Sequence, residues 1–278
     1  MKMKKIEFTK MVAAGNDFVV VVDSRQFIAR WSLNRLAVKM CDRKYGVGAD
    51  GLLIIGKSNK ADIRMRIFNA DGSEAEMCGN GARCAAFWMA NSRHSTAHRP
   101  GNIKIETKAG IVESIMNGGN AKIRITEPKD IRLNVPIMVN GRKLKVNFVN
   151  TGVPHAIVFV QGLEKIDVDN IGKVIRYHPE FLPSGTNVDF VEVVDDDFIK
   201  VRTYERGVED ETLACGTGSI ASAIISALRV QGTGYSKIEV ETRGGETLKV
   251  FFNKQGTKIS DVWLEGLAKI VYKGVFYV

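Results

Sequence analysis

The sequence predicts an α+β fold of two homologous lobes, each a curved, mostly antiparallel sheet wrapped around one central helix. The first observation is a duplicated motif, because Cys78-Gly79-Asn80-Gly81 recurs as Cys215-Gly216-Thr217-Gly218, 137 positions later. The second is that segments flanking the two copies recur at nearly the same offset. The third is that expected strands far outnumber expected helices. Two copies of one fold, related by pseudo-twofold symmetry, account for all three.

The repeated flanks set the domain boundaries. The matched segments are 48–50 with 185–187, 63–69 with 199–205, and 103–110 with 238–245. Pro128 marks the crossover between lobes. We expect an N-terminal lobe of residues 1–128 plus 267–278 that carries Cys78, and a C-terminal lobe of residues 129–266 that carries Cys215.

The first lobe begins with alternating strands and one amphipathic helix. Apolar runs predict strands, turn residues separate them, and Ser32 is expected to cap a helix that ends near Cys41. A polar loop is expected at 91–102. The expected strands are 6–10, 18–23, 51–56, 62–69, 103–107, 111–117 and 121–126, with a loop at 13–17 and a central helix at 82–90.

The second lobe repeats this order. Asn140-Gly141 predicts a tight hairpin, because both residues adopt positive φ readily. The segment 268–278 has no counterpart at the end of the first lobe, so we expect it to return and complete the first sheet. The expected strands are 131–139, 143–150, 156–160, 188–194, 198–204, 236–242, 246–253 and 258–265, with helices near 169–177 and at 219–228.

Composition excludes several classes of protein. The net charge of +9 comes from basic residues scattered among acidic ones, which argues against a nucleic-acid binder. No apolar run is long enough to span a membrane and no signal peptide is evident, so we expect a cytoplasmic protein. The four cysteines form no CxxC pair, and His94 and His98 lack further ligands at suitable spacing, so no metal site is expected.

Two of the four cysteines are candidates for chemistry. Cys41 and Cys84 fall within apolar helix patterns and are expected to be buried core residues. Cys78 and Cys215 instead precede Gly-x-Gly at predicted helix N-termini, where backbone N–H groups stabilise a thiolate and bind a carboxylate. Two thiols on opposite faces of one carbon would remove a proton from one face and return it to the other, which inverts configuration.

The motifs resemble those of the diaminopimelate epimerases, in the family's order and over essentially the whole chain. The strings are Gly15-Asn16-Asp17-Phe18, 69–73 (Asn-Ala-Asp-Gly-Ser), 78–84 (Cys-Gly-Asn-Gly-Ala-Arg-Cys), 205–208 (Glu-Arg-Gly-Val) and 212–218 (Thr-Leu-Ala-Cys-Gly-Thr-Gly). The cysteine motifs alone also resemble those of proline racemases. The first and fourth strings favour the epimerase.

The resemblance implies a function and a set of site residues. It implies epimerisation of LL- to meso-2,6-diaminopimelate with no pyridoxal phosphate, other cofactor or metal, on the route to lysine and peptidoglycan precursors, by a cytoplasmic homodimer. Cys78 and Cys215 would be the acid–base pair, and His155 and Glu205 would tune their pKa values. The implied substrate-binding residues are Gly79, Asn80, Gly216 and Thr217 for the reacting carboxylate, and Asn16, Asn69, Asn187, Glu205 and Arg206 for the distal end.

The chain departs from the family pattern at three places. Val153 stands where the family often has asparagine, and Gly51 where many members have glutamine. Glu209-Asp210 lengthens the loop before the second cysteine by one residue. All three affect recognition of the distal end of the substrate and leave both cysteines in place.

Three alternatives remain open from the sequence. A racemase of another amino acid, such as proline, would use the same thiols with a different distal pocket. An inactive relative acting as a binding protein would have no reason to retain both cysteines. A basic nucleic-acid binder would show steeply salt-dependent retention on heparin.

Overall fold

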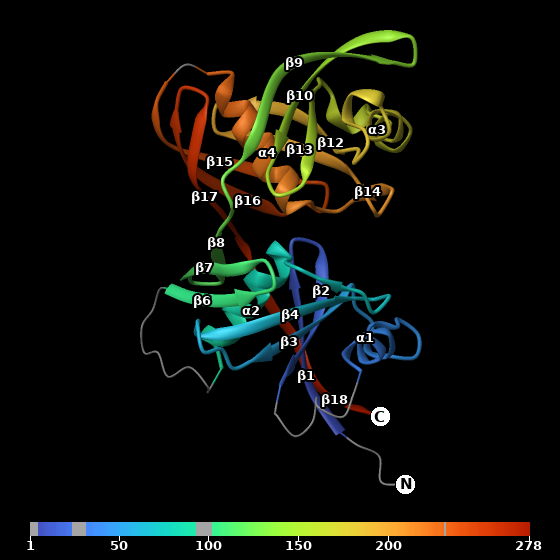
Figure 1. Cartoon of the computed structure of the whole chain (residues 1–278), viewed down its shortest axis with the longest axis vertical. Helices are drawn as coiled ribbons and strands as arrows, with labels where there is room; N and C mark the ends of the chain where they lie inside the picture. The colour runs from blue at the N-terminus through green and yellow to red at the C-terminus, as the bar shows by residue number, and fades with distance from the viewer. Residues whose placement is uncertain (1–4, 24–31, 93–101, 231) are drawn as a thin grey trace. The chain divides into compact units, whose positions relative to one another are not determined.

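The computed structural model describes residues 5–23, 32–92, 102–230 and 232–278. The chain divides into two compact units (Figure 1), one of residues 1–123 with 266–278 and one of residues 124–265. The fold is α+β and dominated by strands, as the sequence predicts. The expected loop at 91–102, with His94 and His98, lies almost wholly outside the described residues.

Unit 1 contains one sheet in the order β18-β1-β2-β3-β4-β6-β7-β8, with the short β5 paired to β4. The β2·β3 and β4·β6 pairings are parallel and the others are antiparallel. The strands are β1 (Lys5–Ala13), β2 (Asn16–Val22), β3 (Gly51–Gly56), β4 (Ile63–Asn69), β5 (Glu74–Ala75), β6 (Asn102–Thr107), β7 (Gly110–Asn117), β8 (Asn120–Arg124) and β18 (Lys269–Tyr277).

Unit 2 repeats this topology strand for strand. Its order is β9-β10-β11-β12-β13-β15-β16-β17, with β14 paired to β13, and the two parallel pairings, β11·β12 and β13·β15, fall at the same places. The strands are β9 (Lys129–Val139), β10 (Arg142–Asn150), β11 (Pro154–Phe159), β12 (Asn187–Asp195), β13 (Phe198–Glu205), β14 (Asp210–Thr212), β15 (Gly234–Thr242), β16 (Thr247–Gln255) and β17 (Lys258–Leu267).

The repeat gives the last strand an unexpected counterpart. β18 pairs antiparallel with β1, as β9 pairs antiparallel with β10. The segment that ends the chain therefore occupies, in unit 1, the place that the first strand of unit 2 occupies in its own sheet. The sequence hides this equivalence because the two strands stand at opposite ends of their copies.

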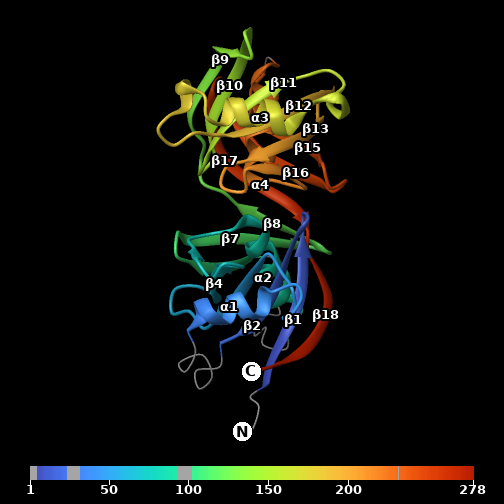
Figure 2. The same cartoon turned by 90° about the vertical axis from the view of Figure 1, so that its right-hand side faces the viewer.

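Each sheet wraps around a buried helix that starts immediately after a cysteine (Figure 2). In unit 1 this is α2 (Gly79–Ala90), which packs against β1–β4, β6 and β7. In unit 2 it is α4 (Gly216–Leu228), which packs against β10–β13, β15 and β16. Both helices begin three residues earlier than predicted. Glycine and asparagine lower helix propensity in the interior but are tolerated in the first turn, where N–H groups lack intrahelical partners.

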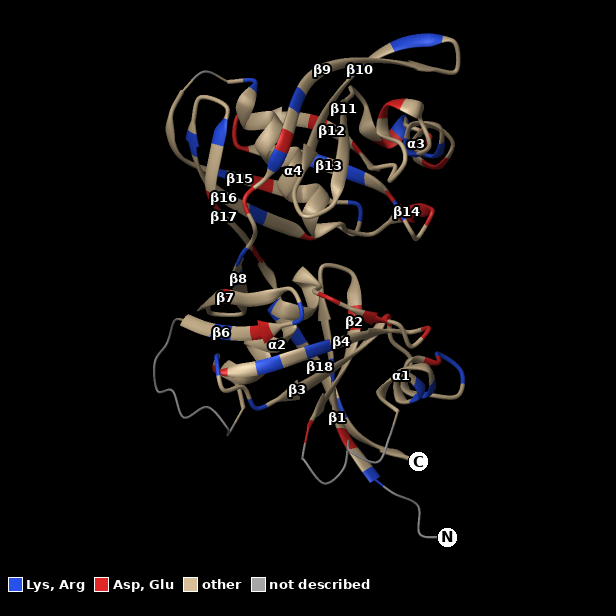
Figure 3. Ribbon diagram, viewed as in Figure 1, with Lys and Arg blue, Asp and Glu red and all other residues tan. Residues whose placement is uncertain are grey.

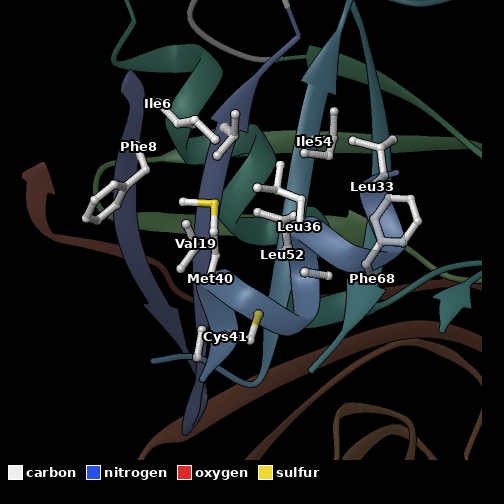
Figure 4. Packing of buried hydrophobic residues seen from close by; sticks show 13 residues of the cluster. Ile6, Phe8, Val19, Leu33, Leu36, Met40, Cys41, Leu52, Ile54 and Phe68 are labelled. Carbon is white, nitrogen blue, oxygen red and sulfur yellow. The ribbon is translucent and has the colours of Figure 1, made fainter. Parts of the chain in front are cut away.

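A second helix covers the other face of each sheet. In unit 1, α1 (Leu33–Cys41) packs its apolar side onto β1–β4, with Leu36, Met40 and Cys41 fully buried (Figure 4). The prediction that Cys41 is a core residue is confirmed, and burial raises the pKa of its thiol to about 11. Cys84 is likewise fully buried, in α2. In unit 2, α3 (Val168–Arg176) contacts β12 and β13 in the same way.

Several local expectations need correction. The loop expected at 13–17 is a two-residue hairpin turn with positive φ at Ala14 and Gly15, so β1 and β2 are longer than predicted. Ser32 occupies the N-cap of α1 but makes no side-chain capping bond. β5 and β14 were not predicted, because two or three residues are too few for a periodic pattern. The Asn140-Gly141 hairpin is confirmed, with positive φ at both residues.

Charged residues of both signs are interspersed over the described part of each unit (Figure 3). No helix among the described residues is long and apolar enough to cross a membrane.

Candidate active site

Both candidate cysteines occupy helix N-caps, as the sequence predicts. Cys78 has extended backbone angles at the start of α2, and its sulfur accepts a hydrogen bond from the Gly81 N–H at 3.4 Å. Cys215 takes the same place before α4. The Gly81 N–H donates to the Cys78 sulfur and the Gly218 N–H to the Cys215 sulfur, and such first-turn N–H groups stabilise negative charge on a thiol.

In unit 1 the structure brings together Asn16 and Asn80. Asn80 is buried in the first turn of α2 and donates from Nδ2 to Oδ1 of Asn16 at 2.6 Å. Its own Oδ1 accepts from Nη2 of the fully buried Arg83 at 2.7 Å. These bonds fix the orientation of both amides, because each has a defined donor and a defined acceptor.

A charged network holds Asn16 from behind, and the sequence reasoning missed it. Asp50 Oδ2 accepts from Asn16 Nδ2 and from the Asp17 N–H, each at 3.1 Å. Arg43 bridges Asp17 and Asp50, and the buried Lys10 binds Asp17 and the Gly48 carbonyl. Despite partial burial, hydrogen bonds from Arg43 and Lys10 hold the pKa of Asp17 well below its ordinary value.

Asn69, the other distal residue predicted in unit 1, lies at the end of β4. Its side chain donates to Ser73 Oγ at 2.9 Å and its N–H donates to the Ser73 carbonyl, so its described bonds close its own turn. Gly51 lies at the start of β3, where an added Cβ would stand 3.0 Å from the Phe68 carbonyl oxygen. The backbone therefore crowds any side chain at the position where many relatives have glutamine.

In unit 2 the predicted residues Cys215, Thr217 and His155 form a connected chain of polar contacts with two residues that were not predicted, Asp189 and Thr203. Cys215 Sγ lies 3.4 Å from Thr217 Oγ1, which lies 3.0 Å from His155 Nε2. His155 Nδ1 lies 2.7 Å from Asp189 Oδ2, and Asp189 Oδ1 accepts from Thr203 Oγ1 at 2.7 Å. His155 and Asp189 have no exposed side-chain surface.

Burial and acidic neighbours set the pKa values here. Burial raises the pKa of Cys215 well above its ordinary value, and the negative charges of Glu205 and Asp189 raise it further. The hydrogen bond that joins Thr217 Oγ1 to the sulfur and the hydrogen bond from the Gly218 N–H oppose this shift. Burial also raises the pKa of Glu205, with Asp189 adding to the effect and His155 opposing it. The net effect of these groups is that Cys215 favours the neutral thiol over the thiolate.

Asn187 connects this chain to the Glu-Arg motif. It donates from Nδ2 to the Pro154 carbonyl at 3.0 Å, and its Oδ1 accepts from the Arg206 N–H at 2.8 Å. Arg206 donates from Nη1 to the Ser184 carbonyl at 3.1 Å. It also lines a cavity of about 390 Å³ whose other walls include Phe148 and Glu180 and none of the other predicted site residues. The bond to Ser184 orients the guanidinium and uses only part of its hydrogen-bonding capacity, since an arginine side chain carries five N–H donors.

The extra residue before Cys215 also has a visible structural effect. Glu209 adopts φ of +62°, in the left-handed region, and its carboxylate accepts from Arg176, Tyr177 and the Gly207 N–H. These bonds tie the loop after Arg206 to the end of α3.

The duplicated sheets differ behind the two cysteines. Strand register makes Phe18, Leu53 and Ile67 the equivalents in unit 1 of His155, Asp189 and Thr203 in unit 2. Gly81 of α2 packs against Leu53, and Gly218 of α4 packs against Asp189. The surroundings behind Cys78 are therefore apolar, and those behind Cys215 are polar. The signal for Asp189 was present in the sequence as an acidic residue between the apolar Val188 and Phe190.

Among the described residues, no three His, Cys, Asp or Glu side chains are grouped so that they could hold a metal ion.

Sequence comparison identifies close relatives over the whole chain. Residues 8–129 and 147–265 match the family model of diaminopimelate epimerase. A diaminopimelate epimerase of Aquifex aeolicus is 41% identical over 280 residues, covering 97% of both chains. One of Archaeoglobus fulgidus is 42% identical over 284 residues, covering 98% of this chain and 96% of the relative.

Solved structures share the fold at lower sequence identity. A PhzF-family phenazine biosynthesis protein of Bacillus anthracis superposes with a TM-score of 0.76 at 21% identity, covering 99% of both chains. A hydroxyproline epimerase of Agrobacterium vitis superposes with a TM-score of 0.68 at 15% identity, covering all of this chain and 92% of that one. The family match and the identity over nearly the full length lead to one conclusion: the chain belongs to the diaminopimelate epimerase family of isomerases.

Proposed function

We propose that this protein interconverts LL- and meso-2,6-diaminopimelate without a cofactor, using Cys78 and Cys215 as its acid–base pair. The observation that carries the proposal is that both cysteines cap buried helices at equivalent places in a duplicated fold. In each reaction direction one cysteine, as thiolate, takes the α-proton, and the other, as thiol, donates a proton to the opposite face of the planar carbanion.

Helix N-termini are suited to stabilise the charge that develops on the reacting carboxylate. Gly79 and Asn80 begin α2, and Gly216 and Thr217 begin α4, so each pair presents backbone N–H groups beside its cysteine. Donors fixed in place before the reaction stabilise a developing oxyanion without reorganisation. We assign these four residues to the reacting carboxylate.

The distal amino acid end of the substrate needs a carboxylate partner and an ammonium partner. Arg206 offers a guanidinium, of which Nη1 donates to the Ser184 carbonyl, and the half-buried Glu205 precedes it in the chain. Asn187 holds the Arg206 backbone in place. We assign the distal end to these three residues together with Asn16 and Asn69.

His155 and Glu205 lie where they can adjust the acidity of Cys215. His155 reaches the sulfur through Thr217, and Glu205 acts on the thiol through its charge. Burial and the charge of Glu205 both raise the pKa of the thiol, so a base such as His155 is needed for the thiolate to form.

The test is proton NMR of the purified protein in D2O with meso-diaminopimelate, under reducing conditions and without pyridoxal phosphate. We expect loss of the α-proton signal with appearance of the LL isomer, and neither in C78A nor in C215A. Turnover that survives in both variants would refute the two-cysteine mechanism.

The same assay separates the main alternative, a racemase of another amino acid. The departures at Gly51 and Val153 are a reason to test this alternative, because both fall in sequence motifs associated with the distal end of the substrate. No exchange of diaminopimelate combined with exchange of proline or hydroxyproline would move the assignment to that class.

We further infer a cytoplasmic homodimer that acts in lysine and peptidoglycan precursor synthesis. The mechanism requires two reduced thiols, which the cytosol maintains. Among the described strands β18 is hydrogen-bonded to β1, and its side chains Val271, Tyr272, Val275 and Tyr277 are exposed, which suits an interface. Sedimentation of the purified protein as a monomer at micromolar concentration would contradict the dimer.

A further inference from the structure

The polar chain behind Cys215 ends in a residue to which the proposed mechanism gives no role. Asp189 has no exposed side-chain surface and lies in β12 between apolar neighbours. A buried carboxylate is costly unless hydrogen bonds and charge compensate for lost hydration. Its oxygens are used by two side chains, Thr203 through Oγ1 and His155 through Nδ1, at 2.7 Å each.

We propose that Asp189 is a positioning residue for Cys215, acting by holding His155 in the tautomer that carries its proton on Nδ1. A carboxylate only accepts hydrogen bonds, so the nitrogen facing it at 2.7 Å must be the donor. Nε2 of a neutral His155 is then an acceptor. This inference rests on the proposed role of Cys215 as an acid–base group.

The fixed tautomer gives a direction to the remaining contacts. Thr217 Oγ1, 3.0 Å from Nε2, donates its proton to His155 and has its lone pairs free to accept from Cys215 at 3.4 Å. The opposite tautomer would place a ring N–H against the Thr217 oxygen and turn the hydroxyl proton toward sulfur. Only the Nδ1–H form therefore provides an acceptor path that leads away from the thiol.

This path lets a buried thiol become a base. The Cys215 proton moves to Thr217 Oγ1 as the Thr217 hydroxyl proton moves to His155 Nε2. The products are a thiolate and an imidazolium, and the imidazolium remains hydrogen-bonded to Asp189. The reverse transfer restores the thiol, which is the form that donates a proton to the substrate carbanion. No proton is gained or lost in either direction.

The other charged groups around Cys215 do not replace this path. Glu205 on β13 and Asp189 on β12 both raise the pKa of Cys215, so their charges alone favour the thiol. Asn187 Nδ2 lies 3.5 Å from His155 Nε2 and is bound to the Pro154 carbonyl at a shorter distance. In unit 1 the equivalent positions are Phe18, Leu53 and Ile67, whose side chains carry no titratable group.

The primary test is nitrogen-15 NMR of the full-length protein labelled in histidine. The chain has four histidines, and H155Q identifies the signal to be followed. We expect the neutral ring of His155 to show the Nδ1–H pattern in the wild type. We expect D189N to convert it, wholly or in part, to the Nε2–H pattern.

Turnover of diaminopimelate provides the functional reading. We expect D189N to lower kcat by about 100-fold, at the low end of acid–base contributions, with KM changed by less than about threefold. T203V keeps the Asp189 carboxylate and should lower kcat by less than about tenfold. S222A serves as the matched control: it removes a buried hydroxyl from α4, the helix that carries Thr217, and should leave kcat unchanged.

The outcomes separate this inference from the proposed function. An Nε2–H ring in the wild type overturns the inference even if D189N does not fold. Wild-type kcat in a folded D189N, or an unchanged tautomer in it, also overturns it. A wild-type protein that exchanges no α-proton of diaminopimelate refutes the proposed function instead, while the tautomer measurement still reports on Asp189.

Discussion

The difference between the two helix N-termini predicts unequal losses of stability from one small substitution. An added Cβ at Gly218 would lie 2.3 Å from Asp189 Oδ1, closer than any side chain tolerates. An added Cβ at Gly81 would meet the end of the Leu53 side chain at 3.1 Å, which a small rotation relieves. Gly218→Ala therefore displaces a buried carboxylate, and Gly81→Ala displaces a methyl group.

The two changes differ in magnitude. Overpacking costs about 1–3 kcal/mol, and loss of one hydrogen bond to a buried carboxylate costs about 1.5–3 kcal/mol, so Gly218→Ala should destabilise by about 2.5–6 kcal/mol. At Gly81 the helix propensity gained by alanine, up to about 1 kcal/mol, offsets the shift of Leu53. The net change there should stay within about 1 kcal/mol.

Scanning calorimetry of both variants tests this difference. At roughly 3 °C per kcal/mol for a unit of this size, G218A should melt about 7.5–18 °C below the wild type and G81A within about 3 °C of it. Equal shifts in Tm would refute the reasoning, because they would mean that Asp189 does not pack against the first turn of α4.

Three further predictions concern other residues. Glu211 binds Arg202 through both oxygens at 2.6 Å, and both side chains are largely buried, so E211Q should lower the free energy of unfolding by about 2–4 kcal/mol. E74Q breaks the equivalent but more exposed pair with Arg66 in unit 1 and should lower it by about 1 kcal/mol; equal losses in urea titrations would contradict this. R206K should raise KM for diaminopimelate by at least about tenfold with less effect on kcat, since lysine loses the planar fork, and an unchanged KM in steady-state assays would remove Arg206 from the site. Burial raises the pKa of Cys41 to about 11, so the neutral thiol stabilises the fold fully below about pH 8.5, and this contribution is lost as the pH approaches 11. Relative to C41A, the free energy of unfolding of the wild type should fall by about 2 kcal/mol between about pH 8 and pH 10.5. Parallel curves of unfolding free energy against pH for the two proteins would count against this prediction.

The fold was predictable because the sequence repeats itself. The two Cys-Gly-x-Gly motifs identified both inner helices, and the matched segments predicted the duplication and most of the strands along the chain. The repeat could not reveal that β18 and β9 are equivalent, since sheet neighbours are set by hydrogen bonding and not by chain order. Short strands such as β14 were missed because their pairing depends on β13 and leaves no periodic pattern of its own.

Site residues inside a recognisable sequence motif could be predicted, and those whose role depends on a partner from another strand could not. Cys215 and Thr217 stand inside a motif. Asp189 becomes significant only when β11, β12 and β13 lie side by side, because that arrangement places His155 and Thr203 against its two oxygens. A sequence pattern reports which face of a strand is buried, but the partner on the neighbouring strand comes from the three-dimensional pairing.

The placement of β18 has a consequence for the order in which the molecule is built. Unit 2 is one continuous stretch, residues 124–265, and holds all its own strands. Unit 1 takes its edge strand from residues 269–277, beside residues 5–12. During synthesis the ribosome releases every strand of unit 2 before it releases the last strand of unit 1. Strands β1 to β8 therefore leave the ribosome before the strand that completes their sheet, and until residues 269–277 emerge β1 can pair only with β2.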